Sequence, residues 1–212
     1  MTIRVMLVDD HAVVRMGFRL LLESDASGVE VCAEAESGET ALKLYPEVLP
    51  DVVIMDVSMP GMGGIEAVSR LLAKDPLARI LVLSAHEDTV HPKRLLKAGA
   101  LGYLSKRTAG DELLRALRQV AEGRNYIDPV LAQQLAVQQF SGDQNPVEVL
   151  SEREFEVFMQ LAGGQSVNRI AETLFLSPRT VGTHLYNIKQ KLGAENSAEL
   201  ALIAIRNGLL SP

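Results

Sequence analysis

Residues 1–124 alternate five times between a short apolar run and a longer segment whose apolar residues recur at helical spacing. The apolar runs cover residues 3–8, 29–33, 51–55, 80–83 and 101–104. Strands that alternate with helices form a parallel sheet with right-handed crossovers and helices on both faces. We therefore expect an α/β doubly wound, five-stranded parallel sheet of flavodoxin-like order 2-1-3-4-5, in which the first and third strands are neighbours at the switch point.

The third apolar run ends in a carboxylate. Residues 52–55 carry no charge, which is typical of a parallel strand buried on both faces, and Asp56 follows them directly. A Pro60-Gly61 turn then breaks the chain. Ligands of open α/β sheets bind beside the carboxyl ends of the strands. Asp56 is therefore either a polar residue that merely closes the strand or part of a binding site, and this run alone does not decide between them.

Polar residues also follow three other predicted strands. Asp9 and Asp10 follow the first strand, Ser84 the fourth and Lys106 the fifth. Three carboxylates at one edge of a sheet repel each other unless a cation joins them, and an all-oxygen ligand set suits Mg²⁺. A lysine and a hydroxyl opposite them would stabilise the oxygens of a phosphoryl group, with Asp56 as the nucleophile that forms an aspartyl phosphate. This constellation predicts a phosphoryl-transfer site.

Four motifs carry a family resemblance: LVDD at 7–10, DVVIMDVSMPGMGG at 51–64, LSA at 83–85 and GYLSK at 102–106. With these motifs at the expected spacing, residues 1–124 resemble the receiver domain of a two-component response regulator. The resemblance implies that Asp56 accepts a phosphoryl group from a phosphohistidine of a sensor histidine kinase. It also implies a Mg²⁺ site formed by Asp9, Asp10 and Asp56, with the backbone carbonyl of Ser58 as a further ligand.

The same resemblance assigns roles to residues of the fourth and fifth strands. Ser84 would bond the phosphoryl group, Lys106 would pair with it, and Tyr103 would rotate into the space that Ser84 vacates. Plain core packing is the alternative for Tyr103, and His11 is either a fourth polar ligand or a surface residue. Many receivers have threonine where Ser84 stands and proline where Arg107 stands, and neither departure removes a group that the chemistry needs.

The pattern changes after residue 124. Residues 129–139 predict one further helix, and residues 141–146, SGDQNP, are polar and rich in turn formers, which is typical of a linker. Only helical periodicity follows. We therefore divide the chain into a receiver domain at 1–124, a linker with one helix at 125–146, and an all-α, four-helix domain at 147–212.

Two short predicted helices in the last domain are separated by only a few residues. The first covers 167–174, and the second begins with the N-cap Ser177 and Pro178 and ends before Gly193. This pattern is typical of a helix-turn-helix, whose second helix enters the major groove of DNA. One face of the second helix must be buried, and it consists of Val181, Leu185, Ile188 and Leu192.

The opposite face of the second helix is predicted to contact DNA. Residues 173–194 contain no acidic residue, although the chain has a net charge of −6, and Arg179, Lys189 and Lys191 flank the face. Thr, Asn and Gln read base edges, Arg and Lys neutralise phosphates, and a helix N-terminus holds a phosphate. The predicted contacts are Ser177, Arg179, Thr180, Gly182, Thr183, Tyr186, Asn187, Lys189 and Gln190. The alternative is a scaffold that binds protein through these helices.

Residues 150–194 resemble the LuxR-type DNA-binding domain, from LSEREFEV to KLGA. Together with the receiver, the whole chain is similar to the NarL/FixJ class of transcriptional regulators. Many members of that class carry lysine where Gly182 and Tyr186 stand, so we expect a different base readout. The resemblance implies a phosphorylation-dependent regulator, not an enzyme, that binds double-stranded DNA as a homodimer on an inverted repeat.

Composition excludes several other classes of protein. The single cysteine excludes a disulfide framework, no apolar run approaches the roughly 20 residues that span a bilayer, and acids directly follow the first apolar run, unlike in a signal peptide. We expect a cytoplasmic protein without membrane contact. A phosphatase of the haloacid-dehalogenase type would need an acid where Ser58 stands, and no GxxxxGK[ST] or strand-linked GxGxxG motif supports a nucleotide-dependent enzyme.

Overall fold

The computed structural model describes residues 2–24, 28–85, 90–141 and 146–210. The chain forms two compact units, Met1–Val137 and Gln138–Pro212. None of the helices in the described ranges combines the length and the apolar character that crossing a bilayer requires.

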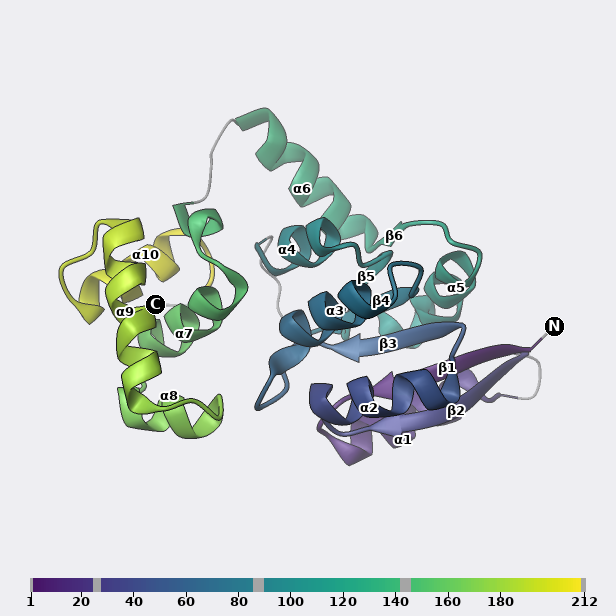
Figure 1. The fold of residues 1–212 in the computed structure, drawn as a ribbon. Coiled ribbons are helices and arrows are strands. Elements are labelled where there is room, and N and C mark those ends of the chain that lie inside the picture. Colours follow the sequence, from purple (N-terminus) through teal and green to yellow (C-terminus); the bar gives the residue numbers. More distant parts are fainter. Residues whose placement is uncertain (1, 25–27, 86–89, 142–145, 211–212) are drawn as a thin grey trace. The chain divides into compact units, whose positions relative to one another are not determined.

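The first unit is built on a parallel sheet of six strands in the order β2-β1-β3-β4-β5-β6 (Figure 1). The strands are β1 Ile3–Val8, β2 Val29–Ala35, β3 Val52–Asp56, β4 Ile80–Ser84, β5 Gly102–Ser105 and β6 Tyr126–Ile127. The predicted parallel sheet and the order of its first five strands are confirmed. The predicted count of five strands was wrong, because Tyr126 and Ile127 pair with Gly102 and Tyr103 at the edge of the sheet. A two-residue strand is too short to produce a hydrophobic period, so these residues were assigned to the linker.

Five helices cover the sheet: α1 Ala12–Leu22, α2 Gly38–Val48, α3 Gly63–Lys74, α4 Val90–Ala98 and α5 Ala109–Ala121. Alternate residues of β1, β3 and β4 form one core layer with α1 and α5, where Leu22, Leu113 and Leu117 are fully buried. On the other side, α3 packs beside α2 and α4. Because both faces are covered, every residue of β3 and β4 is buried, as their uninterrupted apolar sequence predicted.

Helix α2 contains Pro46 and continues past it to Val48, although a proline ordinarily kinks or ends a helix. Proline removes only one N–H donor from the helix ladder, and the next turn still forms, since the Leu49 N–H donates to the Tyr45 carbonyl at 2.9 Å. Tertiary contacts hold this turn in place: the Tyr45 side chain is buried and its hydroxyl donates to Asp75 at 2.7 Å. Leu49 follows the last helical residue as the C-cap, and its left-handed backbone, with φ of +47°, ends the helix.

Helix α6, Pro129–Ser141, follows β6 directly and matches the helix predicted at 129–139. Asp128 precedes it, and the Asp128 carboxylate accepts the Val130 N–H at 3.0 Å. Leu131 is buried, whereas Val130 and Val137 are 63% and 60% exposed, so α6 leaves large apolar side chains in solvent. The centre of the predicted linker, residues 142–145, lies outside the described residues.

The second unit consists of the short 3-10 helix η1 Pro146–Val149 and the helices α7 Glu152–Ala162, α8 Val167–Thr173, α9 Pro178–Leu192 and α10 Ser197–Arg206. A capping box begins α7, because the Ser151 side chain accepts the Glu154 N–H and the Glu154 carboxylate accepts the Ser151 N–H. Residues from all four α-helices form the core, namely Phe155, Phe158, Ile170, Val181, Ile188 and Leu200.

Candidate functional site

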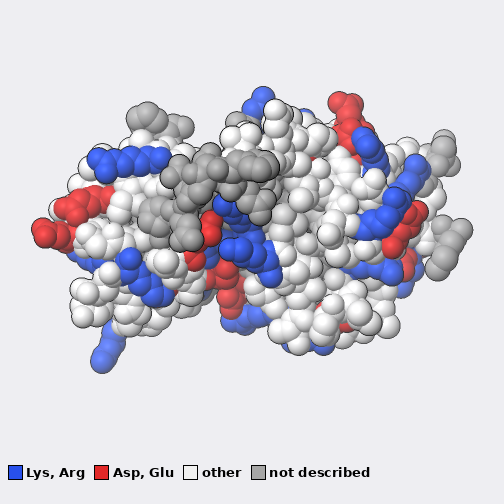
Figure 2. Space-filling model, turned by 90° about the horizontal axis from the view of Figure 1, so that it is seen from above, with Lys and Arg blue, Asp and Glu red and all other residues white. Residues whose placement is uncertain are grey.

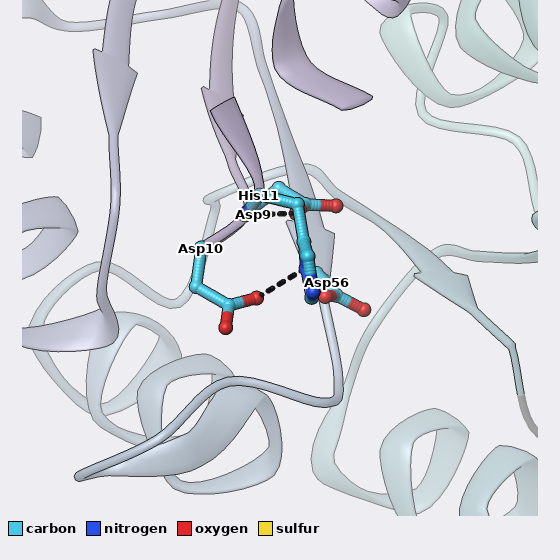
Figure 3. A group of neighbouring side chains, drawn as sticks. All are labelled: Asp9, Asp10, His11 and Asp56. Carbon is cyan, nitrogen blue, oxygen red and sulfur yellow. Dashed lines mark hydrogen bonds and ion pairs between the residues drawn. The ribbon is translucent and has the colours of Figure 1, made fainter. Parts of the chain in front are cut away.

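Four polar side chains meet at the carboxyl ends of β1 and β3 (Figure 3). These strands are neighbours in which Val8 lies opposite Met55, so the residues that follow, Asp9 and Asp56, come out at the same edge. Both carboxylates are buried, with Asp9 3% and Asp56 1% exposed. One ligand atom from each of Asp9, Asp10, His11 and Asp56 can be chosen so that all four lie within 4.8 Å of one another. The acids predicted from separate strands therefore share one site.

Lys106 reaches this site from the end of β5. Its ammonium lies 2.7 Å from Asp9 Oδ2 and 2.9 Å from Asp56 Oδ2, and its backbone N–H donates to the Ser84 carbonyl at 2.8 Å. Burial raises the pKa of Asp56 above its ordinary value, although Lys106 and the Ser58 N–H act in the opposite direction. Burial opposes the charged form of Lys106, but hydrogen bonds to Asp9 and Asp56 outweigh it and raise the pKa of the lysine. One ammonium therefore serves two buried carboxylates.

The donor set fits a hard divalent cation. Three carboxylates lie together in this site, and the Lys106 ammonium pairs with two of them, Asp9 and Asp56. Carboxylate oxygens are the ligands that Mg²⁺ prefers. His11 belongs to the same group, since its Nδ1 lies 2.8 Å from Asp10 Oδ1, while 65% of its side chain is exposed. The structure thus places His11 beside the acids and leaves both of its predicted roles, polar ligand and surface residue, available.

Of the remaining predicted residues, Ser58 and Ser84 lie at the same edge of the sheet, and Tyr103 lies within β5 opposite Val82. The Ser58 N–H donates to Asp56 Oδ1 at 3.2 Å. Ser84 ends β4, is fully buried, and stands opposite Ser105 in the register with β5. The Tyr103 side chain is 2% exposed and borders a cavity of about 250 Å³.

A glycine that was not singled out from the sequence fixes the backbone around Asp56. A Cβ added to Gly64, near the start of α3, would lie 2.1 Å from the Asp56 carbonyl oxygen and 2.6 Å from the Val57 Cα. The Gly64 N–H donates to the Val57 carbonyl at 3.0 Å, so the helix start and the strand end are in direct contact. Only glycine permits this approach. Adjacent glycines at a predicted helix start, here Gly63-Gly64, are the sequence signal for such packing.

Helix α9 presents the predicted face. Ser177 is its N-cap and accepts the Thr180 N–H at 3.0 Å. Of the predicted inner face, Val181 and Ile188 are fully buried, and Leu185 and Leu192 are half-buried. Of the predicted outer face, Gly182, Thr183, Tyr186 and Gln190 are exposed, whereas Asn187 and Lys189 are half-buried.

Three side chains of α9 already have partners. The Thr183 hydroxyl donates to the Arg179 carbonyl at 3.1 Å, and the Lys189 ammonium donates to the Glu195 carbonyl at 2.8 Å. Lys191, expected to flank the DNA face as a phosphate contact, instead pairs with the buried carboxylate of Glu154 at 2.5 Å. Burial would raise the pKa of Glu154, but the hydrogen bonds from Lys191 and Ser151 hold it below its ordinary value. Lys191 therefore joins α9 to α7.

The distribution of charged side chains over the molecule does not by itself identify a nucleic-acid-binding surface. On the face of the molecule in Figure 2, Lys and Arg side chains are interspersed with Asp and Glu. The local signal is stronger, because α9 contains Arg179, Lys189 and Lys191 and no acidic residue. DNA recognition by this unit would therefore depend on one helix and not on the overall charge.

Both units match known families. Residues 5–118 match the response regulator receiver domain, and residues 148–204 match the luxR family of bacterial regulatory proteins. The chain belongs to the two-component response regulators of the NarL/FixJ class. It is 43% identical to the response regulator GacA of Pseudomonas aeruginosa over 210 residues, which is 98% of each chain. It is 42% identical to the response regulator UvrY of Escherichia coli over 209 residues, which is 98% of this chain and 95% of UvrY.

A solved response regulator has a similar fold. RcsB from Salmonella enterica serovar Typhimurium, bound to the promoter P1flhDC in the presence of the phosphomimetic BeF3−, aligns with a TM-score of 0.72 and 28% identity over the full length of both chains. The two family matches and this similarity agree: the present chain combines a receiver domain with a LuxR-type DNA-binding domain.

Proposed function

We propose that this response regulator is switched by transfer of a phosphoryl group to Asp56 from a sensor histidine kinase. The observation that carries the proposal is the buried Asp56 carboxylate, 2.9 Å from the Lys106 ammonium and next to Asp9 and Asp10. The Asp56 carboxylate attacks the phosphorus of a phosphohistidine. The P–N bond breaks, its electron pair passes to the imidazole nitrogen, and an acyl phosphate forms.

The residues around Asp56 have distinct parts in this transfer. Mg²⁺, held by Asp9, Asp10, Asp56 and the Ser58 carbonyl, would neutralise the charge of the incoming phosphoryl group. In the unphosphorylated protein the Lys106 ammonium pairs with two carboxylates, those of Asp9 and Asp56. Once Asp56 is an acyl phosphate, the ammonium pairs with a phosphoryl oxygen.

Two further side chains respond to the new group. The Ser84 hydroxyl donates to a phosphoryl oxygen, and Tyr103 rotates into the space that Ser84 leaves. These movements distinguish two states of the receiver, and phosphorylation shifts the population between them.

The output of this switch is DNA binding by the four helices α7 to α10. The outer face of α9 enters the major groove, with Thr183, Tyr186, Asn187 and Gln190 at the base edges and Arg179 and Lys189 at the phosphates. Ser177, Thr180 and Gly182 bring the N-terminal half of the helix close to the DNA backbone. Two copies bind an inverted repeat, because a two-fold dimer matches a two-fold site. The working division is a receiver at 1–124, a linker at 125–146 and a DNA-binding domain at 147–212.

Radiolabelling from a small-molecule phosphodonor tests the phosphoryl site. Wild type should acquire label with Mg²⁺ present, and Asp56→Asn should acquire none, because the amide is not a nucleophile for phosphorus. Asp111→Asn, which removes an exposed carboxylate of α5, is the matched control and should label like wild type. Label that persists in Asp56→Asn would refute the assignment. A gel shift against a random DNA pool separates the DNA-binding role from a protein scaffold, which would retard no DNA.

A further inference from the structure

A partly buried hydrogen bond connects the loop that carries Lys106 to the start of α6. We infer that Thr108 and Asp128, which no part of the phosphoryl chemistry requires, are positioning residues that transmit the state of Asp56 to α6. This inference rests on the proposed function. It concerns the contacts through which phosphorylation of Asp56 would affect the helix that follows the receiver.

Thr108 occupies the N-cap position of α5 without capping it. A threonine side chain at this position ordinarily accepts a backbone N–H of the first turn, which stabilises the helix by about 1 kcal/mol. Here the Thr108 backbone is helical, with φ −97° and ψ −5°, and the side chain makes no cap. The hydroxyl lies 3.2 Å from the Ser105 carbonyl oxygen and, closer, 2.6 Å from Asp128 Oδ2, to which it donates across 20 positions of the chain. The shorter of these two bonds therefore joins the β5–α5 loop to the residue before α6.

Asp128 joins three elements at one residue. Its N–H donates to the Tyr103 carbonyl at 3.0 Å, which continues the β5–β6 ladder. Its Oδ1 accepts the Val130 N–H at 3.0 Å and caps α6, and its Oδ2 accepts the Thr108 hydroxyl. The residue is 3% exposed, so water is a poor replacement for any of these partners. A shift of the loop at Thr108 therefore acts directly on the first turn of α6.

The loop between β5 and α5 is short and held at both ends. Lys106 is tied to the phosphoryl site through its ammonium and to the Ser84 carbonyl through its N–H. The Thr108 N–H donates to the Ser105 carbonyl at 3.1 Å, which closes a tight turn. In the sequence only Arg107 separates Lys106 from Thr108, the residue that contacts Asp128. When Lys106 changes its partner from two carboxylates to a phosphoryl oxygen, Thr108 must follow.

A cavity leaves room for this movement. It measures about 250 Å³, and its lining includes Tyr103, Ser105, Thr108, Asp128, Leu131 and Gln134. The first turn of α6 is thus not closely packed on β5, and Leu131 is the buried apolar side chain in that turn. With so little apolar contact, the Asp128 hydrogen bonds make up much of what fixes the helix start. Phosphorylation of Asp56 should therefore weaken the Thr108–Asp128 bond and loosen the first turn of α6.

Amide hydrogen exchange of residues 130–132 in the full chain tests this path, with phosphodonor and Mg²⁺ present or absent. In wild type, phosphorylation should speed exchange there by roughly five- to tenfold, the factor expected when one buried hydrogen bond is lost. Thr108→Val keeps the shape and removes the hydroxyl, so exchange should be fast from the start and insensitive to the phosphodonor. Thr108→Ser keeps the hydroxyl and should respond like wild type. Thr40→Val, in α2, is the matched control.

Intact mass of the same samples reports phosphorylation separately. A wild type that acquires no phosphoryl group refutes the proposed function. If wild type and Thr108→Val are both phosphorylated and α6 responds equally in both, the inference is wrong. Asp128→Ser provides a second variant if Thr108→Val does not fold, because serine still caps α6 but is too short to reach Thr108. It should reproduce the fast, insensitive exchange, and a wild-type response in this variant would also overturn the inference.

Discussion

The Lys106 ammonium lies 2.9 Å from the Asp56 carboxylate, although 50 residues of chain and two strands separate them in sequence. The parallel sheet brings them together, because β3, β4 and β5 are consecutive neighbours whose carboxyl ends share one edge. The same ammonium reaches Asp9 at 2.7 Å. The receiver therefore holds the proposed nucleophile, Asp56, and a second buried carboxylate, Asp9, around one positive charge, and the effect of removing that charge should be measurable.

Removing the Lys106 charge should make receiver stability depend on divalent cations. In Lys106→Met, two buried carboxylates lose their shared partner, which should lower the free energy of unfolding by about 3–5 kcal/mol without Mg²⁺. Saturating Mg²⁺ should restore more stability to the variant than to wild type, because the ion replaces the lost charge. Urea denaturation with and without MgCl2 measures both effects. An identical Mg²⁺ response in the two proteins would argue against a shared cation site.

Adding one methyl group at Gly64 should damage the phosphoryl site through the backbone. The new Cβ would collide with the Asp56 carbonyl oxygen, so Gly64→Ala should destabilise the receiver by about 1–3 kcal/mol and slow the labelling of Asp56. Gly17→Ala is the matched control, since a Cβ there meets nothing within 4 Å in an exposed part of α1. That variant should gain about 0.5–1 kcal/mol from helix propensity and label normally. Equal stability of the two variants would contradict the close approach at Gly64.

The Glu154–Lys191 pair should make the second unit sensitive to acid. The pKa of Glu154 is lowered from 4.5, so its contribution to stability is present above pH 4.5 and is lost as the pH falls through the lower folded-state value. Glu154→Gln retains the capping box but not the charge. The difference in unfolding free energy between wild type and variant should therefore shrink between pH 7 and pH 3. Urea unfolding followed by amide resonances of residues 146–210 measures it, and a constant difference would exclude the ion pair as its source.

Two exposed residues of α9 should affect DNA binding in different ways. Arg179→Ala should weaken binding to all sequences and reduce the slope of log affinity against log salt by about 1, because it removes one phosphate contact. Tyr186, 64% exposed, contributes little to folding, and Tyr186→Ala should alter the sequences selected from a randomised pool. Salt titrations and site selection with both variants compare the two roles. Equal losses on every sequence for both would mean that Tyr186 reads no base.

The meeting of Asp9, Asp56 and Lys106 could be predicted from the sequence because parallel strands place their last residues at one edge of the sheet. Asp9, Asp56 and Lys106 each follow an apolar run, and the topology alone brings them within reach of each other. Periodicity could not reveal β6, which is two residues long, nor the continuation of α2 past Pro46, which depends on the packing of Tyr45.

Long-range side-chain pairs were the least predictable features. In the sequence, Lys191 cannot be distinguished from the other cations of α9. The structure shows that it pairs with Glu154, which lies 37 residues earlier in the chain. Nothing in the local sequence of Thr108 indicated that its hydroxyl contacts Asp128. Such pairs arise from the packing of elements far apart in sequence, which local pattern does not encode.

The most direct test of the whole account is the DNA affinity of the full chain, measured on its own selected site with and without phosphodonor. Phosphorylation should tighten binding by wild type by about fivefold or more, the range of coupling between two sites in one protein. Asp56→Asn should bind with one affinity under both conditions. An affinity of wild type that does not change on phosphorylation, or an equal change in Asp56→Asn, would contradict the claim that Asp56 controls DNA binding.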